Sequence, residues 1–130
     1  MLKQTAYKQQ SVQTASPGEL TLMLYDGCLK QIRFAEHAIE QKNIENRHIA
    51  LSKAEAIIRE LMVTLKTDTE VGMNMMRMYE YILHHLIEAN VKNDVLLLQE
   101  AKTYVEEFRQ TWKQVIQLER QDRYRNTGTL

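Results

Sequence analysis

Residues 71–90 read V-G-M-N-M-M-R-M-Y-E-Y-I-L-H-H-L-I-E-A-N, and this stretch decides the fold class. On a helical wheel of about 100° per residue its apolar side chains cover roughly half the circumference, whereas one core-facing stripe needs little more than about 100°. The stretch therefore predicts a helix that contacts two neighbouring helices, as in a bundle. The side chains on this broad face are Met75, Met76, Met78, Tyr79, Ile82, Leu83, Leu86, Ile87 and Ala89.

Helical patterns lie on both sides of this stretch. Upstream, Ser16-Pro17-Gly18-Glu19 has the form of an N-cap, a proline at the first helical position and a capping box, and predicts a helix over 16–41. Apolar residues at steps of three and four predict further helices over 46–66 and 94–118. Because the connections are short, the four helices predict an all-α fold, an antiparallel up-down-up-down four-helix bundle.

The chain of 130 residues is long enough for one hydrophobic core and too short for two. We expect the bundle to occupy residues 16–118. Residues 1–15 are polar with isolated apolar positions, and we expect them to cap a groove of the bundle through Leu2, Tyr7 and Val12. Residues 119–130 have no apolar stripe and predict a flexible C-terminal tail.

Composition excludes several functional classes. The formal net charge is zero, so the chain lacks the basic footprint of a nucleic-acid-binding protein. No apolar run approaches the ~20 residues of a membrane span, and the N-terminus has no apolar segment typical of a signal peptide. We therefore expect a cytoplasmic protein without membrane insertion. The single cysteine, Cys28, lies on an apolar helix face and predicts a buried, inert thiol.

Catalytic and metal-binding patterns are weak. A di-metal bundle needs two Glu-x-x-His motifs and two further inward glutamates, and Glu45-x-x-His48 is the only such spacing. His84 falls opposite the apolar arc, as in a histidine phosphotransfer domain, but no lysine or small residue follows it at the expected place. Its position, four residues from both Glu80 and Glu88, favours a surface ion pair. We expect no enzymatic activity, no metal and no cofactor.

The apolar excess of residues 71–90 predicts a binding surface. Burial in the core explains one half of the apolar face, but the other half continues round the helix beyond the part that a core would cover. Methionines on that second half suit a surface that adapts to its ligand. The helix over 16–41 is similarly wide. A monomer that exposed both areas would carry a larger apolar patch than soluble proteins normally do, so residues 1–15, a second copy or a partner helix must cover them. The candidate binding residues are Leu22, Tyr25, Leu29, Met73, Met76, Leu83 and Ile87.

Several short motifs, taken in order, resemble the flagellin-specific export chaperones of the FliS family. They follow one another along nearly all of residues 7–115. The motifs are Tyr7, T-A-S-P-G-E-L (14–20), L-Y-D-G (24–27), A-x-x-I-I-x-E-L (54–61), M-Y-E-Y (78–81), A-N (89–90) and Trp112.

The resemblance implies a cytoplasmic bundle that binds the disordered C-terminal segment of flagellin. Such binding would prevent premature polymerisation and keep flagellin competent for the flagellar type III export apparatus. The resemblance also implies a possible homodimer and an N-terminal segment, with Tyr7, that covers the groove when cargo is absent. Two alternatives remain: a structural helical homo-oligomer, and a phosphotransfer-like bundle that uses His84.

Overall fold

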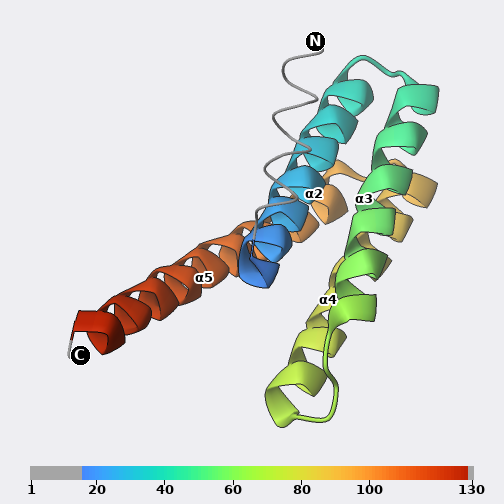
Figure 1. The fold of residues 1–130 in the computed structure, drawn as a ribbon. Coiled ribbons are helices and arrows are strands. Elements are labelled where there is room, and N and C mark those ends of the chain that lie inside the picture. Colours follow the sequence, from blue (N-terminus) through green and yellow to red (C-terminus); the bar gives the residue numbers. More distant parts are fainter. Residues whose placement is uncertain (1–15, 129–130) are drawn as a thin grey trace.

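The computed structural model describes residues 16–128, with side chains to Arg125. This part of the chain consists of four helices joined by short connections and contains no strand (Figure 1). The all-α prediction is therefore confirmed for the described residues. The expected groove cover, with Leu2, Tyr7 and Val12, lies outside them. The helices are α2 (Pro17–Glu40), α3 (Ile44–Thr64), α4 (Glu70–Lys92) and α5 (Val95–Gly128).

Local sequence fixes where α2 begins. The Ser16 hydroxyl accepts a hydrogen bond from the Glu19 backbone N–H at 3.2 Å, and the Glu19 carboxylate accepts one from the Ser16 N–H at 3.4 Å. Pro17 occupies the first turn, where its missing N–H costs nothing. The predicted capping box is confirmed. A second contact anchors this end, because the Trp112 indole N–H donates to the Gly18 carbonyl at 2.7 Å.

The other helices also begin at side-chain caps. Asn43 accepts from the Asn46 N–H at 3.0 Å, and Thr69 accepts from the Gly72 N–H at 3.0 Å. Asp94 precedes α5, and its carboxylate accepts a hydrogen bond from the Leu96 N–H at 2.9 Å. Helix α4 continues through residues 91–92 and ends at a left-handed residue 93 with φ of 53°.

Each helix packs against two others: α2 and α4 both contact α3 and α5. This arrangement accounts for the broad apolar faces, since each helix has to bury one side against each neighbour. The core runs through all four helices. Its largest fully buried side chains are Tyr25, Cys28, Ile32, Leu51, Ile58, Leu61, Tyr79, Ile82, Leu86, Leu98 and Val105.

Helix α5 is longer than predicted. Residues 119–128, which we expected to form a flexible tail, are helical and run out past the start of α2 (Figure 1). Their side chains are exposed as far as they are described. The extension is tied back where the Arg120 guanidinium pairs with the Glu19 carboxylate, and this contact holds the pKa of Glu19 below its usual value. Within residues 16–128, no helix combines the length and the apolar character required to cross a bilayer.

Candidate functional site

The flank of α4 is partly exposed. Met76, Leu83 and Ile87 are half-buried and follow one line along the helix, and Met73, beside that line, is 48% exposed. The same line continues to Asn90, whose side-chain amide hydrogen-bonds to His48 of α3 at 2.9 Å. The line therefore lies on the side of α4 that faces α3. We call Met73, Met76, Leu83 and Ile87 the α4 flank.

Of the three candidate binding residues on α2, one is half-buried and two are buried. Leu22 is half-buried, but Tyr25 and Leu29 are only 1% and 3% exposed. Tyr25 and Leu29 belong to the core and offer no surface to a partner in this structure, which corrects the prediction for these two residues. The apolar arc on α2 is wide because α2 packs against both α3 and α5, and Tyr25 lies against Phe108 of α5.

Tyr25 is part of a buried aromatic cluster. Its hydroxyl lies 2.5 Å from the hydroxyl of Tyr79, and the Phe108 ring packs against both tyrosines at centroid distances of 6.2 and 5.6 Å. Burial raises the pKa of both phenols, so the pair is neutral at physiological pH. The tyrosines of L-Y-D-G and M-Y-E-Y thus join α2 to α4 through the core.

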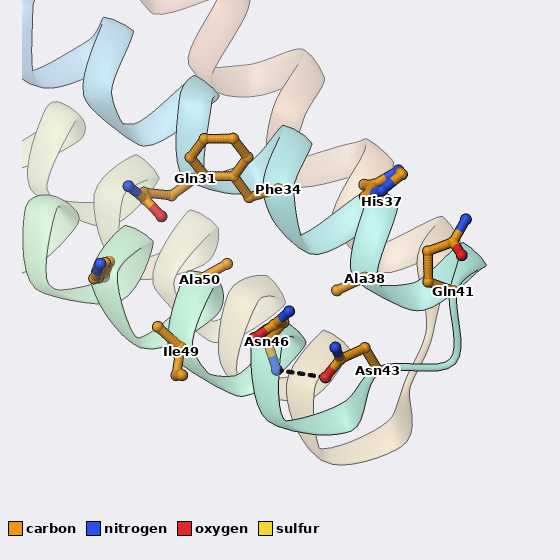
Figure 2. A pocket seen from close by; sticks show the side chains of 10 residues that line it. Gln31, Phe34, His37, Ala38, Gln41, Asn43, Asn46, Ile49 and Ala50 are labelled. Carbon is orange, nitrogen blue, oxygen red and sulfur yellow. Dashed lines mark hydrogen bonds between the residues drawn. The ribbon is translucent and has the colours of Figure 1, made fainter.

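A groove between α2 and α3 was missed by the sequence analysis. It has a volume of about 650 Å³, and Figure 2 shows side chains from both helices around it. Phe34 and Ile49 give it apolar edges and are 53% and 45% exposed. The signal in the sequence was Phe34 on the border of the apolar arc. The other lining residues are Gln31, His37, Ala38, Gln41, Asn43, Asn46, Ala50 and Lys53, so no carboxylate lines the groove.

The end of the bundle that contains the start of α3 and the end of α4 is held by polar contacts. Arg47 donates to the side-chain oxygens of Asn90 and Asn93 at 3.3 and 2.6 Å. Ala89, beside Asn90, is completely buried. The A-N motif therefore fixes the exit of α4 against α3, and with it the position of the α4 flank.

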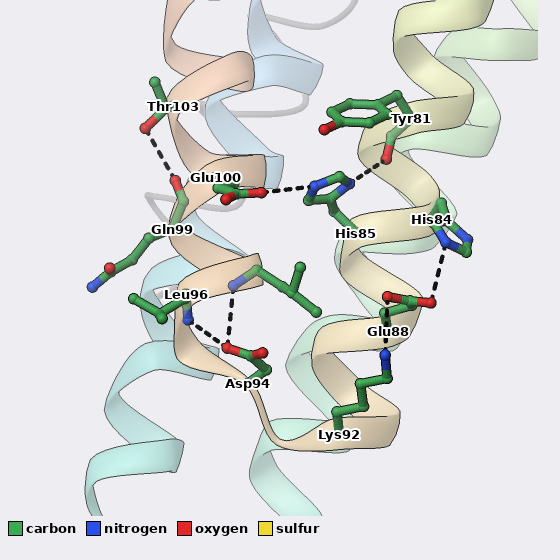
Figure 3. Close-up of polar contacts among 11 residues, drawn as sticks. Tyr81, His84, His85, Glu88, Lys92, Asp94, Leu96, Gln99, Glu100 and Thr103 are labelled. Atoms are coloured by element: carbon green, nitrogen blue, oxygen red, sulfur yellow. Dashed lines mark hydrogen bonds and ion pairs between the residues drawn. The ribbon is translucent and has the colours of Figure 1, made fainter.

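The histidines of α4 make different contacts, drawn in Figure 3. His84 is exposed and pairs with Glu88 at 3.2 Å, which confirms the predicted surface ion pair. His85 is 7% exposed: its Nδ1 donates to the Tyr81 carbonyl at 3.0 Å, and its Nε2 lies 2.9 Å from the Glu100 carboxylate on α5. His85 thus joins α4 to α5 on the side away from the flank.

Few groups in the described part of the chain have the setting of a reactive centre. Among residues 16–128, no three His, Cys, Asp or Glu side chains lie close enough together to hold a metal ion. Burial raises the pKa of the Cys28 thiol to about 12, so Cys28 is protonated at physiological pH. The burial predicted for this residue is confirmed.

These residues define a class of structure: a small helical bundle with partly exposed apolar side chains along its α3–α4 and α2–α3 edges. The chain matches the family model described as flagellar protein FliS over residues 1–119. It is 52% identical over 124 residues to the flagellar secretion chaperone FliS of Bacillus subtilis (strain 168), covering 95% of this chain and 93% of that protein.

More distant relatives point the same way. The chain is 32% identical over 117 residues to the flagellar secretion chaperone FliS of Salmonella typhimurium (strain LT2), covering 85% of this chain and 87% of that protein. It is 30% identical over 109 residues to the protein of the same name from Escherichia coli (strain K12), covering 82% and 80%. The chain belongs to the FliS family, and the resemblance read from the motifs is confirmed.

Proposed function

We propose that this chain is a flagellar secretion chaperone that binds the disordered C-terminal segment of flagellin in the cytoplasm. Binding would prevent premature polymerisation and keep flagellin competent for the flagellar type III export apparatus. The observation that carries the proposal is the α4 flank, an apolar line left partly open beside α3, in a chain whose relatives are named flagellar secretion chaperones.

In the proposed mechanism the chain binds the flagellin segment and catalyses no reaction. An amphipathic segment that becomes helical on binding places side chains at i, i+3, i+4 and i+7 against a groove. Burial of apolar surface contributes about 25 cal/mol per Å², from which the cost of ordering the segment is subtracted. Met73 and Met76 can adjust their rotamers to the cargo, since methionine side chains are flexible and polarizable.

The proposal includes the whole architecture expected from the sequence. The bundle runs up-down-up-down, and residues 1–15 cover the α4 flank with Leu2, Tyr7 and Val12 when cargo is absent. Cargo then displaces this cover, and the free energy needed to open it lowers the apparent affinity. Leu22 remains a candidate contact, while Tyr25 and Leu29 do not, because they are buried.

The variant Met73→Glu/Met76→Glu is expected to bind a synthetic peptide spanning the flagellin C-terminal segment at least about 100-fold more weakly than the unmodified chain, because two carboxylates would be desolvated against apolar cargo. Calorimetric titration measures the affinity, and circular dichroism checks that helicity is retained. The matched control is Leu96→Glu/Leu118→Glu, which places the same charges on exposed positions of α5.

Two outcomes would count against the proposal. Unchanged affinity in the flank variant would move the cargo contact away from Met73 and Met76. Failure of the unmodified chain to bind the peptide at all would contradict the chaperone function. Sedimentation with and without the peptide separates the rival function: a chaperone takes up one peptide per protomer, whereas a purely structural homo-oligomer ignores it.

A further inference from the structure

Glu55 of α3 has a nearly buried side chain, and its carboxylate keeps some contact with solvent and has no partner among residues 16–128. Its side chain belongs to the buried class, with 9% exposure, in a helix whose other buried side chains are apolar. Among the described residues it takes part in no hydrogen bond and in no ion pair within 4.0 Å. Desolvation raises the pKa of this carboxyl above its usual value, although Arg59 and His48 act on it from a distance in the opposite direction.

The contacts of its neighbours show which way Glu55 faces. Ile57 points to α2, where its Cδ1 lies 3.5 Å from the position of a Cβ built on Gly27. Ala50 lines the α2–α3 groove. His48, one heptad before Glu55 and on the same face, hydrogen-bonds to Asn90 of α4. Glu55 therefore lies on the side of α3 that faces α4.

The same hydrogen bond gives the level of Glu55 along the bundle. His48 near the start of α3 contacts Asn90 near the end of α4, while the other ends of these helices are joined by residues 65–69. Seven residues forward from His48 is Glu55, and seven residues back from Asn90 is Leu83. The carboxylate is thus level with Leu83, in the middle of the α4 flank.

A charged group in this position has a physical cost. A carboxylate that is partly desolvated and lacks hydrogen bonds lowers the free energy of unfolding, because it gives up part of its hydration without gaining a partner. The cost is removed when a cation binds, and an arginine or lysine that becomes buried at the same time makes a strong, charge-assisted contact. The surrounding apolar flank would exclude water from such a pair.

We propose that Glu55 is a specificity-determining residue of the surface formed by the α4 flank and that it pairs with one arginine or lysine of the flagellin segment. The apolar side chains of that segment then contact Met76, Leu83 and Ile87 around the ion pair. Arginine suits the position better, since its planar guanidinium can donate two parallel hydrogen bonds to one carboxylate. The inference rests on the proposed function and adds the chemistry by which this surface selects the register of its cargo.

The variant Glu55→Gln tests the proposal through two readouts of opposite sign. Its affinity for the flagellin C-terminal peptide, measured by calorimetry at neutral pH, is expected to fall at least about tenfold, because the cargo cation loses its partner. Its midpoint of urea unfolding without peptide is expected to rise, because a partly desolvated charge that has no hydrogen bond among the described residues has been removed. The control Glu107→Gln removes one charge from an exposed position on the far face of α5 and should change neither readout.

Peptide variants locate the partner. Each arginine and lysine of the peptide is replaced by glutamine in turn, and every peptide is titrated into both forms of the chain. One replacement should weaken binding to the unmodified chain as much as Glu55→Gln does, and should have no further effect on Glu55→Gln, as in a double-mutant cycle.

Other results would overturn the inference. Equal affinity of Glu55→Gln and the unmodified chain would overturn it while leaving the chaperone function intact. A lower unfolding midpoint for Glu55→Gln would mean that the carboxylate pairs within the chain, with Arg59 in solution, and would also overturn it. If the unmodified chain does not bind the peptide, both the inference and the proposed function fail.

Discussion

Gly72→Ala is expected to lower the free energy of unfolding by at least about 3 kcal/mol, measured by urea denaturation. Gly72 is buried in the first turn of α4, where its N–H donates to the Thr69 hydroxyl. A Cβ at this position would lie 1.8 Å from the carbonyl oxygen of Lys66, which is far inside van der Waals contact. The obstacle is backbone, so the connection between α3 and α4 has to move.

Gly27→Ala is the matched comparison and is expected to have the opposite sign. Its Cβ would lie 3.5 Å from Ile57 Cδ1, an ordinary contact distance, and Gly27 is in the interior of α2. Alanine is therefore expected to raise the free energy of unfolding by up to about 1 kcal/mol through helix propensity. Equal losses in both variants would contradict this account, since a backbone carbonyl blocks the added Cβ at Gly72 and only an ordinary side-chain contact meets it at Gly27.

The role of one glycine could be predicted from the sequence, and the role of the other could not. Gly27 lies beside the apolar line of α2, a position that is typical of a close helix approach, and Ile57 does approach it. The role of Gly72 depends on how residues 65–69 turn back over the start of α4, which no local pattern encodes. Predictions that rested on local chemistry succeeded best, as at the capping box of Ser16 and Glu19.

The candidate site was harder to predict for a related reason. A helical wheel gives the width of an apolar face but not which neighbour covers each part of it. The α4 flank was assigned from width and remains partly open, whereas Tyr25 and Leu29 were assigned in the same way and are buried. The burial of Glu55 was not predicted, because it arises from the packing of α3 beside α4. A charged residue next to a core line is usually a solvated one.

The buried tyrosine pair gives the second large effect. Tyr25→Phe or Tyr79→Phe alone is expected to lower the free energy of unfolding by about 1–3 kcal/mol, because each removes one hydroxyl and leaves the other buried without its hydrogen bond. The double variant is expected to be close to the unmodified chain, since no unpaired hydroxyl remains and the Phe108 contacts persist. Urea denaturation of all four forms gives the coupling energy directly.

The same variants show whether Tyr25 only stabilises the core or also contacts the proposed flagellin segment. The two side chains are only 1% and 2% exposed, so the double variant should bind the flagellin peptide as the unmodified chain does. If the double variant keeps its stability but loses affinity, Tyr25 must reach the cargo after all, through an opening of α2 away from α5. If stability alone depends on the tyrosines, the L-Y-D-G and M-Y-E-Y motifs act together through one internal hydrogen bond that joins α2 to α4 in the core.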